Sequence, residues 1–282
     1  MAEISAKDVK ALRDQTGAGM MDCKAALKDA EGDVERATDL LRERGLSKAG
    51  KRAGRATSEG AVALSIDGGV GVIIEIGCET DFVAKNDQFQ SLVQGVADAI
   101  RASGDVSDVD AALAAKIEGE TVDEYIKAAV GRVGENIQLK RVGSIRVDGL
   151  VGGYVHGGGK LGVLVGVASD TPGDVAEAAK DMAMHVAAAD PTPLAVDQDG
   201  LDPEVVEKER TILRNQALES GKPENIVDNM VNGRLKKFFA ENCLVEQAFV
   251  RDPDKTVGDI LKGAGGATVT EFLRFKLGEA TE

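Results

Sequence analysis

Two segments of the chain carry the same pattern, in which two alternating apolar runs flank glycines and a helical period follows. In the first segment, apolar residues alternate over 62–66 and again over 70–76, on either side of Gly68-Gly69. In the second segment, the corresponding runs are 150–155 and 161–167. A period of two predicts strands, and glycines between two such runs predict a hairpin. A repeated hairpin-plus-helix unit indicates a duplicated core in which antiparallel sheets combine with helices.

Each predicted hairpin is followed by a helix, and two further strands complete the pattern. Asn86 and Asp87 can cap the first helix, and the second starts at about Gly173. The inward positions of these helices are Phe89, Leu92, Val93, Val96 and Ile100 in the first and Val175, Ala179, Met182 and Val186 in the second. Alternation also predicts a third strand over 137–147, with a bulge at Gly143, and a last strand over 269–277.

Three short helices are predicted at the start of the chain. Ser5 can cap the first, the second runs from Met20 to Asp29, and Gly45 ends the third. Residues 46–58 are small and basic without periodic apolar positions, which predicts a linker. The cations that cluster at the end of residues 1–55 are interpreted mainly as solvated, with an acidic or RNA partner as the alternative; they are Arg44, Lys48, Lys51, Arg52 and Arg55.

The second half of the chain contains a predicted helical hairpin over about 203–240, with its turn at 220–223. Its apolar stripe is narrow and consists of Val205, Ile212, Leu213, Ala217, Ile226, Met230, Leu235 and Phe238. The whole pattern predicts an α+β fold. The expected domains are a helical module at 1–54, a first core subdomain at 55–147, and a second at 148–282 that includes the hairpin.

Composition restricts the class of protein. The chain has 282 residues and a net charge of -14, which argues against a large phosphate-binding surface. Three distant cysteines predict buried, reduced thiols, and two histidines without a C-x-x-C motif argue against a zinc or haem site. His185 lies off its helix's apolar stripe and is predicted to be a surface or boundary residue. No segment resembles a signal peptide or a membrane span, so the expected location is the cytoplasm.

The turn after the first hairpin carries an aromatic residue that fits neither neighbouring pattern. Phe82 follows Asp81 between a buried strand and the next helix, in a chain with only seven Phe, two Tyr and no Trp. An apolar residue beside a carboxylate on such a turn can anchor a binding partner. The alternative is that Phe82 packs under its own loop. The second repeat has Ser169-Asp170-Thr171-Pro172 at this place. Its lack of an aromatic indicates that the fold does not require one.

The sequence contains no motif that predicts a catalytic site. Residues 157–162 match G-x-G-x-x-G, but they join two strands, and no helix begins there to receive a phosphate. The glycines are interpreted as turn residues, and His156 beside them as exposed enough to contact a partner. No Ser/His/Asp or Cys/His arrangement is apparent. The residues alone therefore predict a binding protein without catalytic machinery and without a cofactor.

Several strings of residues, in this order and spacing, resemble bacterial translation elongation factor Ts over nearly the whole chain. They are Leu12-Arg13, Thr16-Gly17-Ala18-Gly19-Met20-Met21-Asp22-Cys23-Lys24, Cys78-Glu79-Thr80-Asp81-Phe82-Val83-Ala84, Tyr154-Val155-His156-Gly157 and Lys255-Thr256-Val257-Gly258. The resemblance implies a ubiquitin-associated-like module at the start, a core of two subdomains and a helical hairpin. It also implies cytoplasmic guanine-nucleotide exchange on the GTPase elongation factor Tu, with no chemistry of its own.

The resemblance further implies which residues contact the GTPase. Thr80, Asp81, Phe82 and Val83 would disturb its magnesium site so that GDP leaves and GTP can bind. Gly19, Met20 and Met21 would hold its GTP-binding domain, while His156 and Gly157 would contact another domain. A complex of two factor–GTPase pairs is a further implication. Many members of the family continue into an additional C-terminal helical module, which this sequence is expected to lack.

Two other functions stay open at the level of sequence. The basic segment and the helical module could bind nucleic acid, although the net charge of -14 argues against it. A nucleotide-utilising enzyme would need a bound nucleotide in the chain alone. Exchange on elongation factor Tu, without direct binding of nucleic acid or membrane, is the leading hypothesis.

Overall fold

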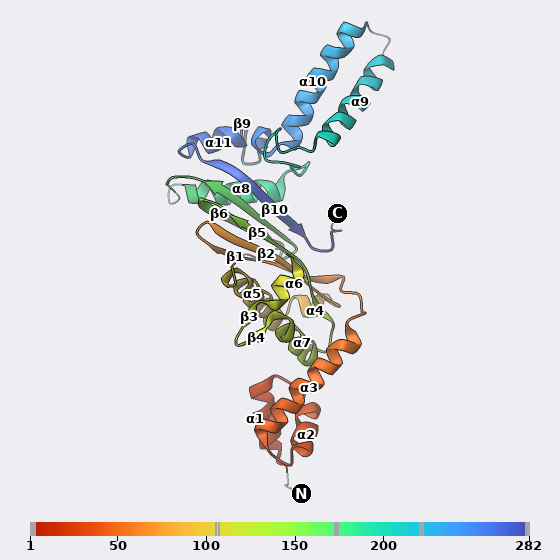
Figure 1. Cartoon of the computed structure of the whole chain (residues 1–282), viewed down its shortest axis with the longest axis vertical. Helices are drawn as coiled ribbons and strands as arrows, with labels where there is room; N and C mark the ends of the chain where they lie inside the picture. Colours follow the sequence, from red (N-terminus) through yellow and green to blue (C-terminus); the bar gives the residue numbers. More distant parts are fainter. Residues whose placement is uncertain (1–3, 105, 107, 172–174, 220–222, 280–282) are drawn as a thin grey trace.

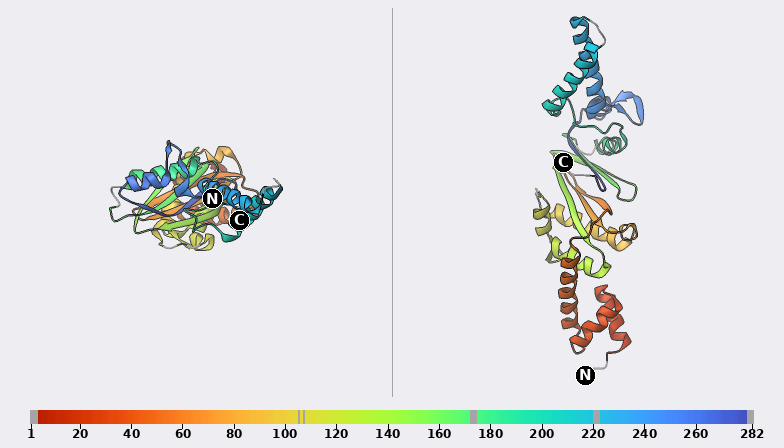
Figure 2. Two further views of the ribbon diagram at one scale, coloured as in Figure 1. Left: turned by 90° about the horizontal axis from the view of Figure 1, so that it is seen from above. Right: turned by 90° about the vertical axis from the view of Figure 1, so that its right-hand side faces the viewer.

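The computed structural model of the protein describes all residues except 1–3, 105, 107, 172–174, 220–222 and 280–282. The described part is elongated (Figures 1 and 2). Small helices lie at one end, two sheets with their helices form the middle, and a helical hairpin projects from the other end. Separate helical and antiparallel sheet regions make this an α+β fold, as the sequence predicts.

The N-terminal helices are α1 (Ala6–Thr16), α2 (Met20–Asp29) and α3 (Val34–Arg52). Ser5 and Asp8 form a capping box at the start of α1, and Gly17 ends that helix in the left-handed conformation. The core between the helices is small and consists of Val9, Leu12, Cys23, Ala26, Leu27, Ala30 and Ala37. A core of this size leaves much of each helix surface available for contacts elsewhere.

Gly45 does not end the third helix, so the prediction of a linker over 46–58 is wrong for 46–52. Helix α3 continues to Arg52 and crosses α7 (Val122–Val133). A Cβ at Gly131 of α7 would lie 2.7 Å from the Cα of Gly45. The two glycines therefore allow the helices to approach closely. A glycine can serve as a helix stop or as a contact point, and the spacing of the sequence alone does not separate these roles.

The first sheet has the order β1-β2-β5, built from β1 (Glu59–Asp67), β2 (Val70–Cys78) and β5 (Ile137–Arg146). The predicted two-glycine turn joins β1 and β2. The bulge predicted at Gly143 lies instead at Lys140, where the pairing of β5 with β2 shifts. Gly143 pairs with Ile73, and a Cβ there would meet Leu273 Cδ1 at 2.8 Å. This glycine is thus required by packing between sheets.

Helices cover the outer face of the first sheet. They are α4 (Asp81–Ala84), α5 (Asp87–Ala102), α6 (Val109–Ala114) and α7, with the short strands β3 (Lys116–Ile117) and β4 (Glu120–Thr121) between them. All five predicted inward positions of α5 are buried. Asn86 caps α5, and Thr121 with Glu124 forms a capping box on α7.

The second sheet repeats the first, with the order β10-β7-β6. Its strands are β6 (Gly149–His156), β7 (Leu161–Ala168) and β10 (Thr268–Lys276). Its outer face is covered by α8 (Ala176–Ala188) and α11 (Val257–Gly263), near the short elements η2 (Leu244–Glu246), β8 (Ala248–Phe249) and β9 (Asp252–Thr256). In each sheet the second hairpin strand is central, so the duplication holds in topology as well as in sequence.

The two sheets pack face to face, and helices lie outside them, which gives four layers (Figure 1). The shared inner layer contains Val62, Ile73, Ile145, Val151 and Leu164. Because β2 and β7 are covered on both faces, nearly all of their residues are buried. This explains why both read as almost continuous apolar runs rather than as a strict alternation.

Each hairpin turn is hydrogen-bonded to the other half of the core. The N–H of Val62 in β1 donates to Gly159 O at 2.7 Å, and the N–H of Val151 in β6 donates to Gly68 O at 2.9 Å. Within each half, the residue after the third strand is bonded to the turn of its own hairpin, since Val147 N–H donates to Gly69 O and Leu277 N–H to Lys160 O, each at 2.9 Å. The two halves are therefore related by an approximate two-fold symmetry.

The projecting hairpin consists of α9 (Pro203–Glu219) and α10 (Glu224–Asn242). Its core is formed by Leu213, Ala217, Val227, Val231 and Leu235. Three residues of the predicted stripe, Val205, Ile212 and Ile226, are instead exposed. The helices thus meet along a face that is rotated from the predicted one, and Val227 rather than Ile226 turns inward.

The prediction that His185 is a surface residue is wrong. Its side chain is 1% exposed within α8 and stacks on Phe249. Nε2 lies 2.9 Å from Gln247 Oε1, and Nδ1 accepts the N–H of Val250 at 3.2 Å. Since Nδ1 accepts, the ring is neutral and carries its proton on Nε2, and burial lowers the pKa of His185. A segment far along the chain completes this pocket, which helical spacing does not reveal.

Candidate functional site

The turn after β2 presents Phe82 to solvent. Thr80 caps α4, and its hydroxyl accepts the N–H of Val83 at 3.4 Å. Val83 and Ala84 pack against the first core, whereas the side chain of Phe82 is 83% exposed. The alternative in which Phe82 packs under its own loop is therefore wrong. An exposed aromatic on a capped turn that is anchored to a core is well suited to insert into a pocket of another protein.

Two charges accompany this aromatic side chain. Lys85 Nζ donates to Asp81 Oδ2 at 2.7 Å, one helical turn away. This hydrogen bond lowers the pKa of Asp81 and raises that of Lys85. Both groups are exposed, so a partner can replace Lys85 as the neighbour of the Asp81 carboxylate at little cost. Asp81 is thus available as a charged contact beside the apolar one.

Glu135 and Asn136, which the sequence analysis did not single out, help to hold the base of the turn. Glu135 accepts two hydrogen bonds from Thr80, and Glu79 accepts one from Asn136. Burial raises the pKa of the Cys78 thiol to about 12, and its Sγ donates to Thr80 O at 3.2 Å. Cys78 is consequently an unreactive structural thiol. No local pattern points to Glu135, because its partner lies 55 positions away.

The second group of predicted site residues lies at the start of α2. Gly19 is the N-cap, and Met20 and Met21 follow with 51% and 75% of their surfaces exposed. The two Met side chains therefore do not fill the core of the module. Cys23, Ala26 and Leu27 of the same helix form its inner face. Flexible, polarisable side chains at an exposed helix start are suited to contact a protein surface.

The third group, His156 and Gly157, lies in the turn between β6 and β7. His156 is exposed, and its Nδ1 lies 2.9 Å from the hydroxyl of Tyr154. Gly157, Gly158 and Gly159 all have positive φ, as the interpretation as turn glycines requires. No helix follows this turn, since strand β7 begins at Leu161. The prediction that these glycines join two strands is therefore confirmed.

These three groups do not form one cluster. The turn at 157–160 lies beside the start of β1, where Glu59 pairs with Cys78 at the end of β2. It therefore lies at the same end of the sheets as the Phe82 turn. The end of β10 lies there too, since Lys276 pairs with Leu161, and Figure 1 shows α4 and this end of β10 on the same side of the molecule. The start of α2 lies apart from both, in the module. Only an extended surface could contact all three.

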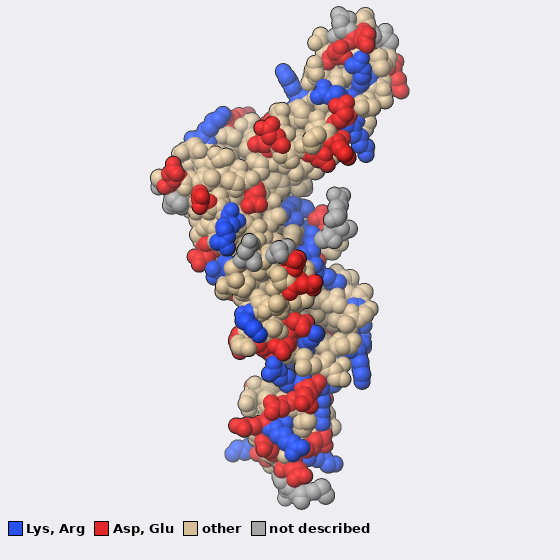
Figure 3. Space-filling model, in the orientation of Figure 1, with Lys and Arg blue, Asp and Glu red and all other residues tan. Residues whose placement is uncertain are grey.

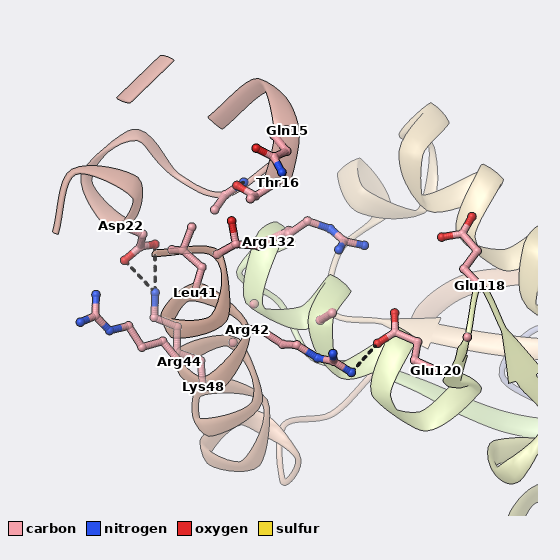
Figure 4. Close-up of a pocket in the computed structure, with 16 residues that line it drawn as sticks. Gln15, Thr16, Asp22, Leu41, Arg42, Arg44, Lys48, Glu118, Glu120 and Arg132 are labelled. Carbon is pink, nitrogen blue, oxygen red and sulfur yellow. Dashed lines mark hydrogen bonds and ion pairs between the residues drawn. The ribbon is translucent and has the colours of Figure 1, made fainter. Parts of the chain in front are cut away.

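A pocket of about 550 Å³ lies beside the crossing of α3 and α7 and is lined by residues of α1, α2, α3 and α7 (Figure 4). Charged side chains line it, and Arg42 of α3 reaches across to Glu120 at 3.2 Å. Within the lining, Lys48 also pairs with Asp22 at 3.0 Å. The module thus meets the core mainly along α3, with the glycine crossing at its centre.

The basic residues near the end of α3 are mostly paired. Arg44 pairs with Asp29, Lys48 with Asp22, and Arg55 with Glu79. Figure 3 shows acidic and basic side chains interspersed over the N-terminal helices. This arrangement does not favour the alternative of an RNA-binding surface, which needs unpaired cations along one face.

Two properties of the described residues bear on other functions. Among them, no group of three or more His, Cys, Asp or Glu is arranged to hold a metal ion. Within the same residues, no helix combines the length and the apolar character that a membrane crossing requires.

Comparison with known proteins gives a consistent result. The sequence model of a family described as Elongation factor TS matches residues 79–279. Proteins named Elongation factor Ts from Hyphomonas neptunium and Maricaulis maris are 48% and 45% identical to this chain over its full length, and each is covered to 94%. One from Prosthecochloris aestuarii is 43% identical over 99% of the chain and is covered completely. The chain therefore belongs to the elongation factor Ts family, whose members act in translation elongation.

Proposed function

We propose that this protein is the guanine-nucleotide exchange factor for elongation factor Tu. It binds the GTPase, disturbs its magnesium site through Thr80, Asp81, Phe82 and Val83, and promotes release of GDP. The observation that carries the proposal is the 83% exposure of Phe82 on a turn that is anchored at both ends. A large apolar side chain costs free energy in water, and contact with a partner recovers it.

The mechanism is a coupling between two binding events. If the factor binds the nucleotide-free GTPase more tightly than the GDP form, it weakens GDP binding by the same factor. A thousandfold effect corresponds to about 4 kcal/mol. A buried aromatic anchor commonly contributes about 2 kcal/mol, so Phe82 supplies about half.

The remaining free energy comes from the other two groups. Met20 and Met21, beside Gly19, bind the GTP-binding domain of the GTPase, and His156 with Gly157 contacts a different domain. Their separation along the elongated molecule supports this division, since one compact partner domain could not reach all three. The proposed units are the module at 1–54 and the core subdomains at 55–147 and 148–282. The factor acts in the cytoplasm by binding alone and needs no cofactor.

The test is the release of a fluorescent GDP analogue from purified elongation factor Tu. The wild-type chain is expected to accelerate release, and Phe82→Ala to reduce that acceleration about 30-fold, which corresponds to the 2 kcal/mol above. Leu194→Ala is the matched control, because Leu194 is also an exposed apolar residue, 59% exposed, outside the proposed contacts. Its acceleration should equal that of the wild type.

Two outcomes separate the function from the mechanism. If the wild-type chain leaves the release rate unchanged, the exchange function is wrong. If the wild type accelerates release and Phe82→Ala does so equally, the function stands and the role of Phe82 is wrong.

A further inference from the structure

The ladder between β2 and β5 continues by one step in which carboxylates replace backbone carbonyls. The last backbone pair is Cys78 with Ile137. Beyond it, Glu79 Oε1 accepts the N–H of Asn136 at 2.6 Å. In return, Glu135 accepts the N–H of Thr80 at 3.0 Å and its hydroxyl proton at 2.6 Å. We call these four residues, Glu79, Thr80, Glu135 and Asn136, the clasp.

The clasp sets the position of α4. This helix has four residues, too few to be stable by its own hydrogen bonds. Thr80 starts it, and the Thr80 hydroxyl donates to Glu135 while it accepts from Val83. At the other end, Ala84 is buried against the core. Since Phe82 itself is exposed, its direction is determined by these two attachments.

The clasp also holds the end of the N-terminal module. Asn136 is 2% exposed, and its Nδ2 donates to the carbonyl oxygen of Arg55, three residues after the end of α3, at 2.7 Å. The guanidinium of Arg55 pairs with Glu79 at 3.3 Å. The hydrogen bond from Asn136, followed by the ion pair with Arg55, lowers the pKa of Glu79, which keeps this carboxylate charged. One junction thus joins the module to the turn that carries Phe82.

We infer that Glu135 is a positioning residue that holds Phe82 in its outward direction for the GTPase. The inference rests on the exchange function proposed above and extends it to a residue that does not touch the partner. When only a fraction of the molecules presents Phe82 correctly, the apparent affinity falls by that fraction. Charge-assisted hydrogen bonds such as the two from Thr80 are stronger than neutral ones, so their loss is expected to reduce that fraction about tenfold.

Glu135→Gln tests this with little change of shape. A Gln side chain has one acceptor oxygen, and its NH2 group would face a second donor of Thr80. Acceleration of GDP-analogue release is expected to fall about tenfold. Glu271→Gln is the matched control, because it removes the same charge from an exposed position of β10.

A double-mutant cycle with Phe82→Ala separates positioning from general damage. If Glu135 acts through Phe82, Glu135→Gln should change the rate less than about twofold once Phe82 is absent. An equal, tenfold loss in both backgrounds would show that Glu135 acts elsewhere and would overturn the inference. Glu79→Gln, which removes the other carboxylate, provides a second cycle if Glu135→Gln does not fold.

Hydrogen exchange of the free protein gives a readout without the GTPase. The amides of Thr80 and Val83 should exchange about tenfold faster in Glu135→Gln and unchanged in Glu271→Gln. If the wild type fails to accelerate GDP release while these amides respond, the proposed function is wrong and the clasp is real. If release is accelerated and the amides do not respond, the positioning role is wrong.

Discussion

The two halves of the core are built on one plan, and they differ at the ends of their central strands. Gly71 and Gly162 occupy equivalent positions, since a Cβ on either would lie 2.6 or 2.5 Å from a valine Cγ1 of the opposite sheet. Counted from these glycines, Thr171 corresponds to Thr80, and Gly173, outside the described residues, corresponds to Phe82. The alignment of Ser169–Pro172 with 80–83 is thus shifted by two positions.

This comparison distinguishes the features that the fold requires, which both halves share, from the features that one half has alone. The glycines, the turn hydrogen bonds and the apolar inner layer occur in both halves. In the first half, α7 packs against α3 of the N-terminal helices. In the same half, the hydroxyl of Thr80 donates to Glu135. At Thr171 in the second half, the backbone N–H is bonded only two residues back, to the hydroxyl of Ser169. Features of one half alone are therefore candidates for function.

The strongest test of equivalence is in the shared inner layer. Ile73 and Leu164 correspond in the two halves, and both are 0% exposed. Ile73→Ala and Leu164→Ala should each lower the free energy of unfolding by about 3 kcal/mol, because each leaves a cavity in the same layer. Urea unfolding measures both. If one substitution is tolerated, the two sheets do not share a single core.

A largely buried ion pair joins Arg141 to Glu75 in the first half. Arg141 Nε donates to Glu75 Oε2 at 2.8 Å and its guanidinium lies 4.4 Å from the ring centroid of Phe275, whereas Gly166 stands where Glu75 would repeat. Glu75→Gln should lower the free energy of unfolding by about 2 kcal/mol, because Arg141 loses its charged partner. The matched substitution Glu271→Gln, at an exposed strand position, should leave the free energy of unfolding nearly unchanged in the same urea titration.

The junction of α3 with α7 allows an asymmetric test. A Cβ at Gly131 would lie 2.7 Å from the Gly45 Cα, but one at Gly45 would lie 3.9 Å from the Gly131 Cα. Gly131→Ala should therefore lower stability by about 1 kcal/mol or more, whereas Gly45→Ala should be neutral or stabilising because Ala favours the helix. Thermal unfolding compares them, and equal effects would contradict the proposed contact.

The second half alone buries a histidine, which predicts a pH dependence. The pKa of His185 is lowered in the folded state, so below the ordinary value of 6.5 the unfolded chain takes up a proton that the native ring refuses. Stability should be complete above that value and fall as the pH drops towards the lowered pKa. His185→Gln should flatten this slope in urea titrations at about pH 7.5 and about pH 5.5. An unchanged slope would locate the effect in other groups.

The smallest effect is expected at Phe82. Because its side chain is 83% exposed, Phe82→Ala should change the free energy of unfolding by less than about 0.5 kcal/mol, despite its large effect on exchange. A melting curve shows this directly. A substantial loss of stability would show that Phe82 has a structural role, and the contrast between the two halves would then not hold.

The sequence predicts the repeated strands, most helices and their caps, because those depend on periodicity and on neighbours within four positions. It fails where a residue has two possible roles. Gly45 and Gly143 are contact glycines, and His185 is enclosed by a segment far along the chain. The exposed Phe82 could be singled out as an aromatic outside any period. Glu135 could not, because its hydrogen bonds to Thr80 depend on where two distant segments meet.

The mutual hydrogen bonding of the hairpin turns has a consequence for synthesis on the ribosome. The first hairpin emerges early, but two of its hydrogen bonds form only after later segments have been made. Gly68 O accepts from Val151 N–H, and Val62 N–H donates to Gly159 O. Neither sheet can bury its inner face until the other exists, and β10 is synthesised after every other strand of the two sheets. The core therefore should acquire protease resistance in one late step, while the N-terminal helices, with their local contacts, can form first.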